Sequence, residues 1–182
     1  MPITTSDVLG SDQVGIYLAV CGKVVFHPHE LNEEALNRID ECIGLERHPL
    51  TVGGSTLVGA LVTGNSKGLA VADIATESDI DILTSFGDVV VMEGGVNTAG
   101  NLLLCNENGA IASPALPEDG VEIISDVFGI PVAVCSIAGE DVVGSLGVAN
   151  NQGVLLHPDV LPDEVLVIED VLGVPPMVGT VA

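Results

Sequence analysis

The chain repeats one pattern of apolar and polar positions several times. Four similar apolar stretches, VGIYLAVC, VGALVTGN, AGNLLLCN and VGSLGVAN, carry the glycines Gly15, Gly59, Gly100 and Gly144 at their second position. The steps between these glycines are 44, 41 and 44 residues. Self-similarity at a period of about 20–50 residues is typical of chains built from repeated structural units. The pattern therefore predicts an array of four similar units.

A turn signal follows each of the last three stretches. Six residues after the glycine comes a word of the form Asn-x-x-Gly, at 65–68, 106–109 and 150–153. Asparagine and glycine both tolerate turn geometry, so this word between two apolar stretches predicts a β-hairpin. The first unit has Cys-Gly-Lys at this place, which indicates a turn shorter by one residue.

A helix and a third strand are predicted after each hairpin. Residues 31–43 place apolar side chains at helical spacing, namely Leu31, Ala35, Leu36, Ile39 and Ile43. Two later helices are expected to begin at prolines followed by acidic pairs, Pro117 and Pro162. Each helix is expected to end at a left-handed glycine, in order Gly44, Gly87, Gly129 and Gly173. A β-rich stretch follows each glycine, so one unit is β-β-α-β.

These units define the expected fold class and domain organisation. We expect an α/β (α+β) repeat in one domain, 1–182, with units at about 12–55, 56–96, 97–140 and 141–182. Residues 2–6 resemble a third strand without its own hairpin, because Pro2 precedes Gly15 by thirteen residues just as Pro131 precedes Gly144. We interpret the chain as four complete units plus an orphan strand of a fifth, whose remaining segment would follow Ala182.

The charge balance is strongly acidic. The chain has 26 acidic and four basic residues, a net charge of −22, and no lysine or arginine follows Lys67. Such a surface repels phosphate backbones, so nucleic-acid binding is not expected and basic proteins are the favoured partners. The alternative is that acidity only keeps a chain rich in glycine and valine in solution, for instance in a salty cytoplasm. The acidic runs at 77–81 and 116–120 are interpreted as solvated helix faces.

Other features exclude several classes of protein. No apolar stretch reaches about 18 residues and the first residues lack a basic and an apolar segment, so we expect neither a membrane span nor export, and the cytoplasm is the expected location. The four cysteines are too far apart for a Cys-x-x-Cys site and are expected to be buried thiols. No phosphate-binding glycine motif is present.

Three segments resemble those of a known family. They are VGGSTLVGALVTGNSKGLAV at 52–71, NTAGNLLLCNENGAIASPAL at 97–116 and VVGSLGVANNQGVLLHPDVL at 142–161. They are similar to the translation initiation factor 6 family, the ribosome anti-association factors of archaea and eukaryotes. The resemblance implies the pentein fold, a pseudo-fivefold propeller of ββαβ units. The chain departs from the family pattern in two ways: the fifth repeat is missing, and the chain is strongly acidic, as archaeal members are.

The resemblance also implies a function. A member would bind the intersubunit face of the large ribosomal subunit, on a basic ribosomal protein beside the sarcin–ricin loop, and would stop the small subunit from joining. It would act in late large-subunit maturation, need no cofactor, and be a monomer when its ring is complete. The residue after each opening glycine would lie near one end of the pseudo-fivefold axis, which nominates Asn101, Ala60 and Ser145. Asn101 is the strongest candidate, although an asparagine there could equally stabilise a turn.

Two other functions stay open at this point. Other penteins modify guanidino groups with a nucleophilic cysteine, a histidine base and acidic residues. His27 and His157 fall in exit turns, and Cys105 and Cys135 fall inside apolar strands, so we expect no catalytic residue. His27, His29 and His48 lack a carboxylate spacing that would complete a metal site. The remaining alternative is an acidic scaffold that binds another basic protein.

Overall fold

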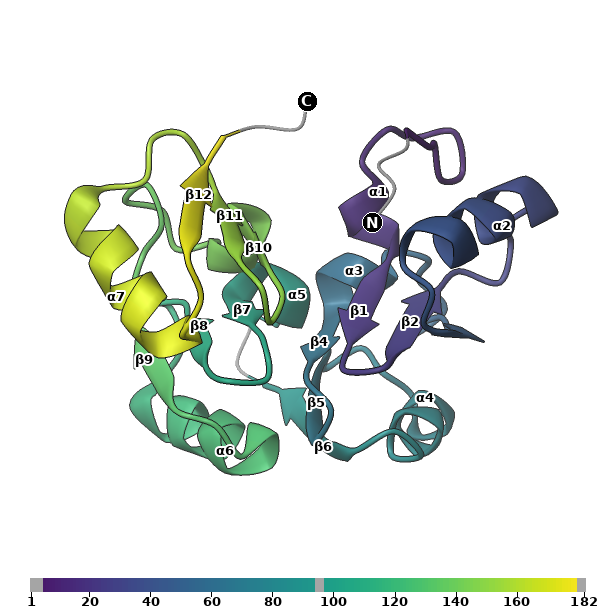
Figure 1. The fold of residues 1–182 in the computed structure, drawn as a ribbon. Helices are drawn as coiled ribbons and strands as arrows, with labels where there is room; N and C mark the ends of the chain where they lie inside the picture. The colour runs from purple at the N-terminus through teal and green to yellow at the C-terminus, as the bar shows by residue number, and fades with distance from the viewer. Residues whose placement is uncertain (1–4, 94–96, 180–182) are drawn as a thin grey trace.

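The structure is a computed structural model that describes residues 5–93 and 97–179. It contains four three-stranded sheets, each formed by one consecutive segment of the chain (Figure 1). We number the four units by these sheets. The strand expected at 2–6 lies mostly outside the described residues, and Thr5 and Ser6 are not in a strand.

Each unit contains a short helix, a hairpin, a longer helix and a third strand. The first unit comprises α1 (Val14–Tyr17), β1 (Ala19–Cys21), β2 (Val24–His27), α2 (Glu33–Cys42) and β3 (Glu46–Pro49). The second comprises α3 (Val58–Leu61), β4 (Val62–Gly64), β5 (Gly68–Ala72), α4 (Glu77–Leu83) and β6 (Asp88–Met92). The third comprises α5 (Ala99–Leu102), β7 (Leu103–Cys105), β8 (Ala110–Ala112), α6 (Glu118–Phe128) and β9 (Val132–Val134). The fourth comprises the 3₁₀ helix η1 (Val143–Ser145), β10 (Gly147–Ala149), β11 (Val154–Leu156), α7 (Pro162–Leu172) and β12 (Pro176–Val178).

The strand pairing is the same in all four sheets. The first two strands form an antiparallel hairpin, and the third strand pairs in parallel with the second. Parallel neighbours need a crossover connection, which the longer helix of each unit supplies. The expected α+β repeat is thereby confirmed.

Two local predictions need correction. In the first hairpin Cys21 pairs with Val24 around two turn residues, and in the second the Asn65 N–H donates to the Gly68 carbonyl, also around two residues. The first turn is therefore not shorter, because Cys21 and Val24 take the places of the asparagine and the glycine.

The second correction concerns the helix ends. Three of the four expected glycines have a positive φ, 66° at Gly44, 58° at Gly129 and 62° at Gly173. Gly87 does not, because α4 already ends at Leu83 and closes with Thr84 in a right-handed conformation. Glycine is required at position 87 for a different reason: a Cβ there would lie only 2.6 Å from the Lys67 carbonyl oxygen.

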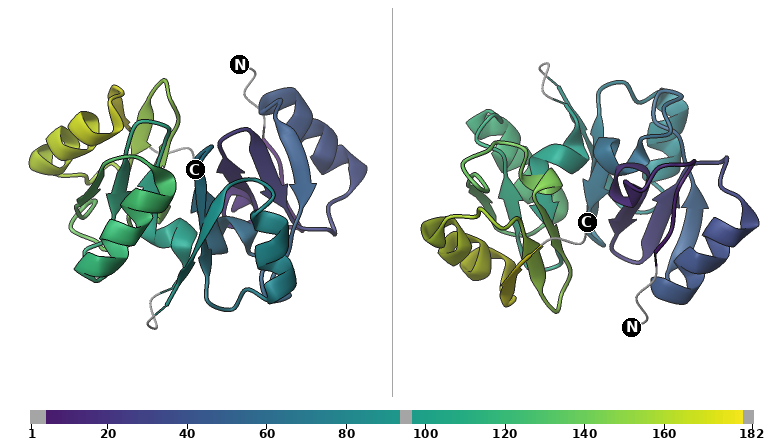
Figure 2. Two further views of the ribbon diagram at one scale, coloured as in Figure 1. Left: turned by 90° about the horizontal axis from the view of Figure 1, so that it is seen from below. Right: turned by 90° about the horizontal axis from the view of Figure 1, so that it is seen from above.

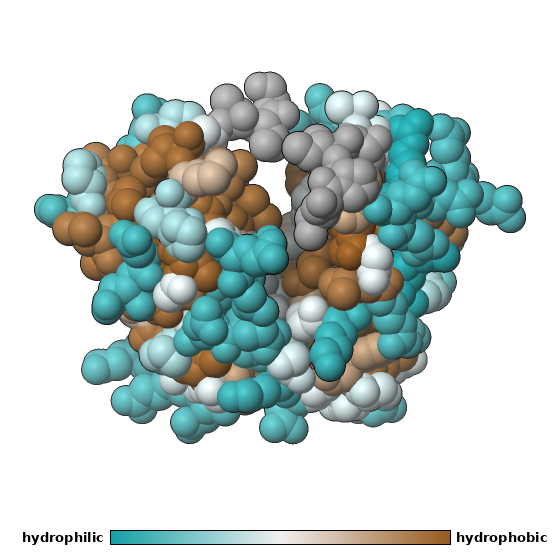
Figure 3. All heavy atoms as spheres, viewed as in Figure 1, coloured by the Kyte–Doolittle hydropathy of each residue, from teal (hydrophilic) through white to brown (hydrophobic). Residues whose placement is uncertain are grey.

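The units lie side by side in chain order. Their short helices and first strands form the inside of an arc, while α2, α4, α6 and α7 lie around its outside (Figures 1 and 2). Apolar clusters fill the contacts between successive units: Phe26 and Leu50 of the first unit belong to one cluster with Leu69 and Leu83 of the second. In the space-filling view the molecule is hollowed between the fourth and first units, with apolar side chains on both sides (Figure 3). Among the described residues, no helix is both long and apolar enough to cross a membrane.

Candidate functional site

The row of short helices is fixed by direct backbone contact between units. A Cβ on Gly59 would lie 2.0 Å from the carbonyl oxygen of Gly15. The same distance, 2.0 Å, separates a Cβ on Gly100 from the Gly59 oxygen and a Cβ on Gly144 from the Gly100 oxygen. Only glycine allows this approach, so the four equivalent stretches are held in a continuous row and the residues after the glycines lie on neighbouring short helices.

Two of the three nominated residues touch each other. The Ser145 hydroxyl donates a hydrogen bond of 3.0 Å to Oδ1 of Asn101, across the interface between the third and fourth units. Asn101 is half-buried and Ser145 is exposed. The Nδ2 group of Asn101 has no hydrogen-bond partner among the described residues, which leaves both of its N–H bonds available. Ala60 is half-buried on α3, the preceding short helix, and has no polar side-chain group to offer.

Exposed apolar side chains accompany this polar pair. Ile16, Leu57 and Val142 lie on or next to the short helices and are 39%, 41% and 42% exposed. We call Asn101, Ser145, Ala60 and these three apolar residues the short-helix face.

Three of the four cysteines lie in surroundings that suppress thiolate formation, although only Cys21 is buried as predicted and the other three are half-buried. Burial, and secondarily the neighbouring Cys105, raises the pKa of the Cys21 thiol well above its usual range. Burial raises the pKa of Cys105 to about 11, and burial also raises the pKa of Cys135. Because the thiolate is the nucleophilic form, these three thiols are poor nucleophiles near neutral pH.

Two of the three histidines considered for a metal site, His27 and His48, are engaged in other contacts. Burial lowers the pKa of His27, whose Nδ1 lies 2.8 Å from the Pro28 carbonyl oxygen. His48 packs edge-on against Phe86, with ring centroids 5.0 Å apart. Within residues 5–93 and 97–179, no group of three or more histidine, cysteine or acidic side chains is placed to hold a metal ion.

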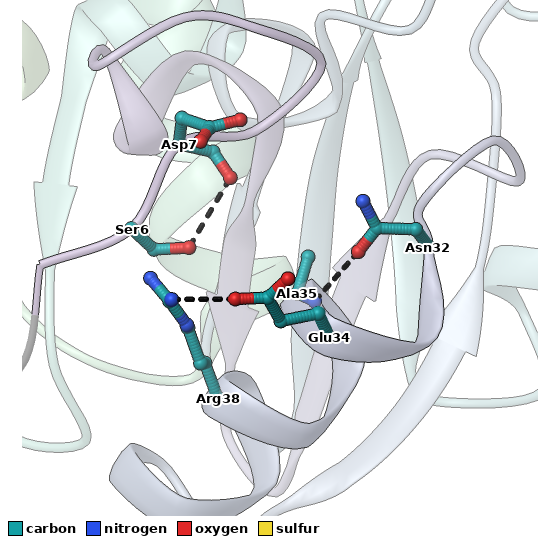
Figure 4. A pocket seen from close by; sticks show the side chains of 6 residues that line it. All are labelled: Ser6, Asp7, Asn32, Glu34, Ala35 and Arg38. Atoms are coloured by element: carbon teal, nitrogen blue, oxygen red, sulfur yellow. Dashed lines mark hydrogen bonds and ion pairs between the residues drawn. The ribbon is translucent and has the colours of Figure 1, made fainter.

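A small void of about 50 Å³ lies where α2 begins (Figure 4). The polar side chains around it are engaged with near neighbours: Asn32 accepts from the Ala35 N–H at 2.8 Å, and Arg38 pairs with Glu34 at 2.7 Å. Ser6 donates to the Asp7 carbonyl. Most of the polar groups around this void are therefore engaged in helix capping and in contacts between near neighbours.

The hairpin asparagines have a role that the sequence interpretation did not include. Asn65 Nδ2 donates to the Phe128 carbonyl at 2.9 Å, and Asn106 Nδ2 donates to the Leu172 carbonyl at 2.9 Å. Each asparagine thus satisfies a carbonyl at the end of the next unit's helix, while its Oδ1 accepts from its own turn. The regular position six residues after each glycine is the signal that could have revealed this role.

Two acidic side chains are buried where their helices begin. Asp79, 9% exposed, accepts from the Gly53 N–H at 2.8 Å. Glu164, 6% exposed, accepts from the N–H groups of Ala138 and Gly139. Each carboxylate thus binds the turn that leads into its unit. The run at 77–81 is therefore only partly solvated, contrary to the prediction, whereas Glu118 and Asp119 of the run at 116–120 are exposed as predicted.

Comparison with known proteins identifies the family of this repeat protein. The family model described as the eIF-6 family matches residues 3–182. The chain belongs to the eIF-6 family.

Individual relatives agree with this assignment. Translation initiation factor 6 of Methanothermobacter thermautotrophicus is 39% identical over 134 residues, which are 73% of this chain and 60% of the relative. The proteins of that name from Methanocella arvoryzae and Halorubrum lacusprofundi are each 34% identical, over 73% and 68% of this chain and 60% and 57% of theirs. The chain thus spans about three fifths of the length of the curated relatives it matches.

Proposed function

We propose that this protein binds the large ribosomal subunit at its intersubunit face and prevents premature joining of the small subunit, with a role in large-subunit maturation. The observation that carries the proposal is family membership across residues 3–182, together with relatives named translation initiation factor 6. A factor of this kind acts by occupying a surface, so the proposal includes no catalytic residue and no cofactor, and it places the protein in the cytoplasm.

The proposed contact surface is the short-helix face, with Asn101 at its centre. Asn101 and Ser145 support this choice because they present free hydrogen-bonding groups beside exposed apolar side chains. Ala60 contributes surface rather than a polar contact. The net charge of −22 favours a basic protein as the partner on the ribosome, with no direct sequence-specific contact to RNA.

The proposed complete fold is a pentein ring, of which this chain would supply four units. The first relative is about 223 residues long, since 134 residues are 60% of it, and it is therefore longer than this chain by about one unit. Leu104 and Ile111 of the third unit are buried in a cluster with fourth-unit residues, whereas Val148, which matches Leu104 in register, is 64% exposed. A fifth unit on that face would cover it and complete a monomeric ring.

The alternative functions have less support. The cysteines that a guanidino-modifying enzyme would need have raised pKa values. A general acidic scaffold would explain the charge but not the family match. We therefore retain the ribosome-binding function alone.

Sedimentation with isolated ribosomal subunits tests this proposal. We expect the protein to sediment with large subunits, and Asn101→Arg to weaken binding because it places a long cation in a face proposed to meet a basic partner. Gln152→Arg is the matched control: it makes the same charge change at the far end of β10, on an exposed hairpin turn. Association with small subunits only, or equal weakening by both variants, would contradict the proposal.

A further inference from the structure

The interface between the first and second units is built differently from the other two. At the interface between the second and third units, the hairpin turn closes over the end of α6. Asn65 donates to the Phe128 carbonyl, and Lys67 Nζ donates to the Gly129 carbonyl at 2.9 Å. Gly68 lets the two chains meet, because a Cβ there would lie 2.3 Å from a carbonyl oxygen of α6.

The interface between the third and fourth units repeats this closure. Asn106 and Asn108 each donate a side-chain N–H to the Leu172 carbonyl, at 2.9 and 3.0 Å. A Cβ on Gly109 would lie 2.1 Å from the Val171 carbonyl oxygen. In both interfaces three turn positions are used: the asparagine, the residue two further on, and the glycine.

The first hairpin lacks two of these three features. Cys21 takes the place of the asparagine and cannot cap a helix, and Val24 takes the place of the glycine. The adjoining helix α4 has seven residues, whereas α6 and α7 have eleven each. Lys23 has the same position in its turn as Lys67 and Asn108 have in theirs, yet its ammonium group has no hydrogen-bond or ion-pair partner among the described residues.

A cavity of about 450 Å³ results at this interface. Its apolar lining consists of Val24, Leu69 and Phe86. Val24 and Leu69 are buried, and Phe86 is half-buried. Lys23, Glu46 and Ser85 line it with exposed polar groups. Val24 and Glu46 are register partners on neighbouring strands, and Lys23, in the hairpin turn next to Val24, lines the same cavity as Glu46. A volume of this size lies within the range of about 300–1,000 Å³ that is usual for small-molecule sites.

We propose that this cavity binds a free α-amino acid with an apolar side chain. The Lys23 ammonium would receive the ligand carboxylate, in the way that Lys67 receives a carbonyl at the next interface. A simple anion would be repelled by the net charge of −22, whereas a zwitterion is neutral overall and its ammonium group can face Glu46. The apolar side chain would occupy the space between Val24, Leu69 and Phe86, where burial removes it from water.

The proposal is tested by titrating the ¹⁵N-labelled protein with leucine and recording backbone amide chemical shifts. We expect saturable shifts confined to Lys23, Val24, Ser85, Phe86 and their neighbours. Lys23→Ala and Glu46→Gln should each weaken binding at least about tenfold, as expected for loss of a hydrogen bond to a charged group. Arg38→Ala removes a cation from α2, which does not line this cavity, and should leave the affinity unchanged.

Two analogues of leucine separate the parts of the proposal. The carboxylic acid without the amino group and the amine without the carboxyl group should both bind at least about fivefold more weakly than leucine. Equal binding of either analogue would overturn the zwitterion assignment. Absence of localised shifts with both leucine and phenylalanine at about 20 mM, well above a Kd of 1 mM, would overturn the site itself.

Discussion

The carbonyl oxygen of Gly59 occupies the space that a side chain on Gly100 would need. A Cβ on Gly100 would lie 2.0 Å from that oxygen, and the same contact recurs at the next interface between Gly100 and Gly144. The units are thus joined by their backbones near the centre of the arc. Glycine at positions 59, 100 and 144 is therefore a geometric requirement for joining one unit to the next.

Alanine at Gly100 should destabilise the protein strongly. The new methyl group collides with a backbone atom that cannot rotate away, so the two units must separate locally, at a cost of about 2–4 kcal/mol. Gly15→Ala is the matched control, because its Cβ meets nothing within 4 Å and its φ is not in the positive range. Chemical denaturation should show a large loss for Gly100→Ala and little change for Gly15→Ala; equal losses would contradict the contact.

The hairpin asparagines provide a second matched pair. Asn106→Ala removes a buried amide that donates to the Leu172 and Asn150 carbonyls and accepts from two N–H groups of its own turn, and it should cost about 2–3 kcal/mol. Asn150 has the same position in its own turn and accepts from Gln152 and Gly153, but it is exposed and its Nδ2 has no partner among the described residues. Asn150→Ala should therefore cost only about 1 kcal/mol in thermal or denaturant unfolding. A larger loss for Asn150 than for Asn106 would refute the cross-unit role.

Acid should weaken the protein through Glu164. Burial raises the pKa of this carboxyl, but hydrogen bonds from the Leu161 N–H, the Ser136 hydroxyl and the N–H groups of Gly139 and Ala138 outweigh burial and lower it. A pKa lower in the folded state means that the stabilisation is present above the unfolded pKa and is lost as pH falls through the folded pKa.

Glu164→Gln isolates this contribution. The variant should have a lower Tm than the parent at pH 7, and the difference should shrink as the pH falls through the lowered pKa of the folded parent, where its carboxyl takes up a proton. A difference in Tm that stays constant from pH 7 to pH 3 would show that the charge of Glu164 is not what stabilises the turn.

Salt should stabilise the fold. A net charge of −22 on 182 residues opposes compaction by self-repulsion, and salt screens it with a Debye length of about 10 Å at 0.1 M. The Tm should rise between low and molar concentrations of sodium chloride. A Tm that is flat or falls over this range would mean that self-repulsion is not a significant part of the free energy of unfolding.

The elements could be predicted because their signals are local. The Asn-x-x-Gly words produce hairpin turns through the asparagine's own Oδ1, and the helix of residues 31–43 follows from its apolar spacing. The prediction that α4 ends at Gly87 was wrong. Gly87 is constrained by the Lys67 carbonyl, and this contact joins segments that are twenty residues apart. A glycine needed for close approach cannot be told from a capping glycine without knowing its neighbour.

In the candidate site, too, local signals could be read from the sequence, whereas contacts between distant segments could not. The family resemblance nominated Asn101, Ala60 and Ser145, each the residue after an equivalent glycine, but the hydrogen bond between Asn101 and Ser145 depends on how two units pack. Asp79 and Glu164 look like ordinary acids at helix starts, since their burial comes from a turn that precedes the helix by about 25 residues. Such contacts need the three-dimensional arrangement of successive units.

The measurement that tests the central claim most directly is subunit joining. Isolated large and small ribosomal subunits would be mixed under associating conditions with increasing amounts of the protein, and the joined and free species would be separated on a density gradient. The account predicts that the free large-subunit peak grows at the expense of the joined peak, that the protein sediments with it, and that Asn101→Arg loses this effect while Gln152→Arg keeps it. Unchanged joining in the presence of the folded protein at saturating concentration would contradict the account.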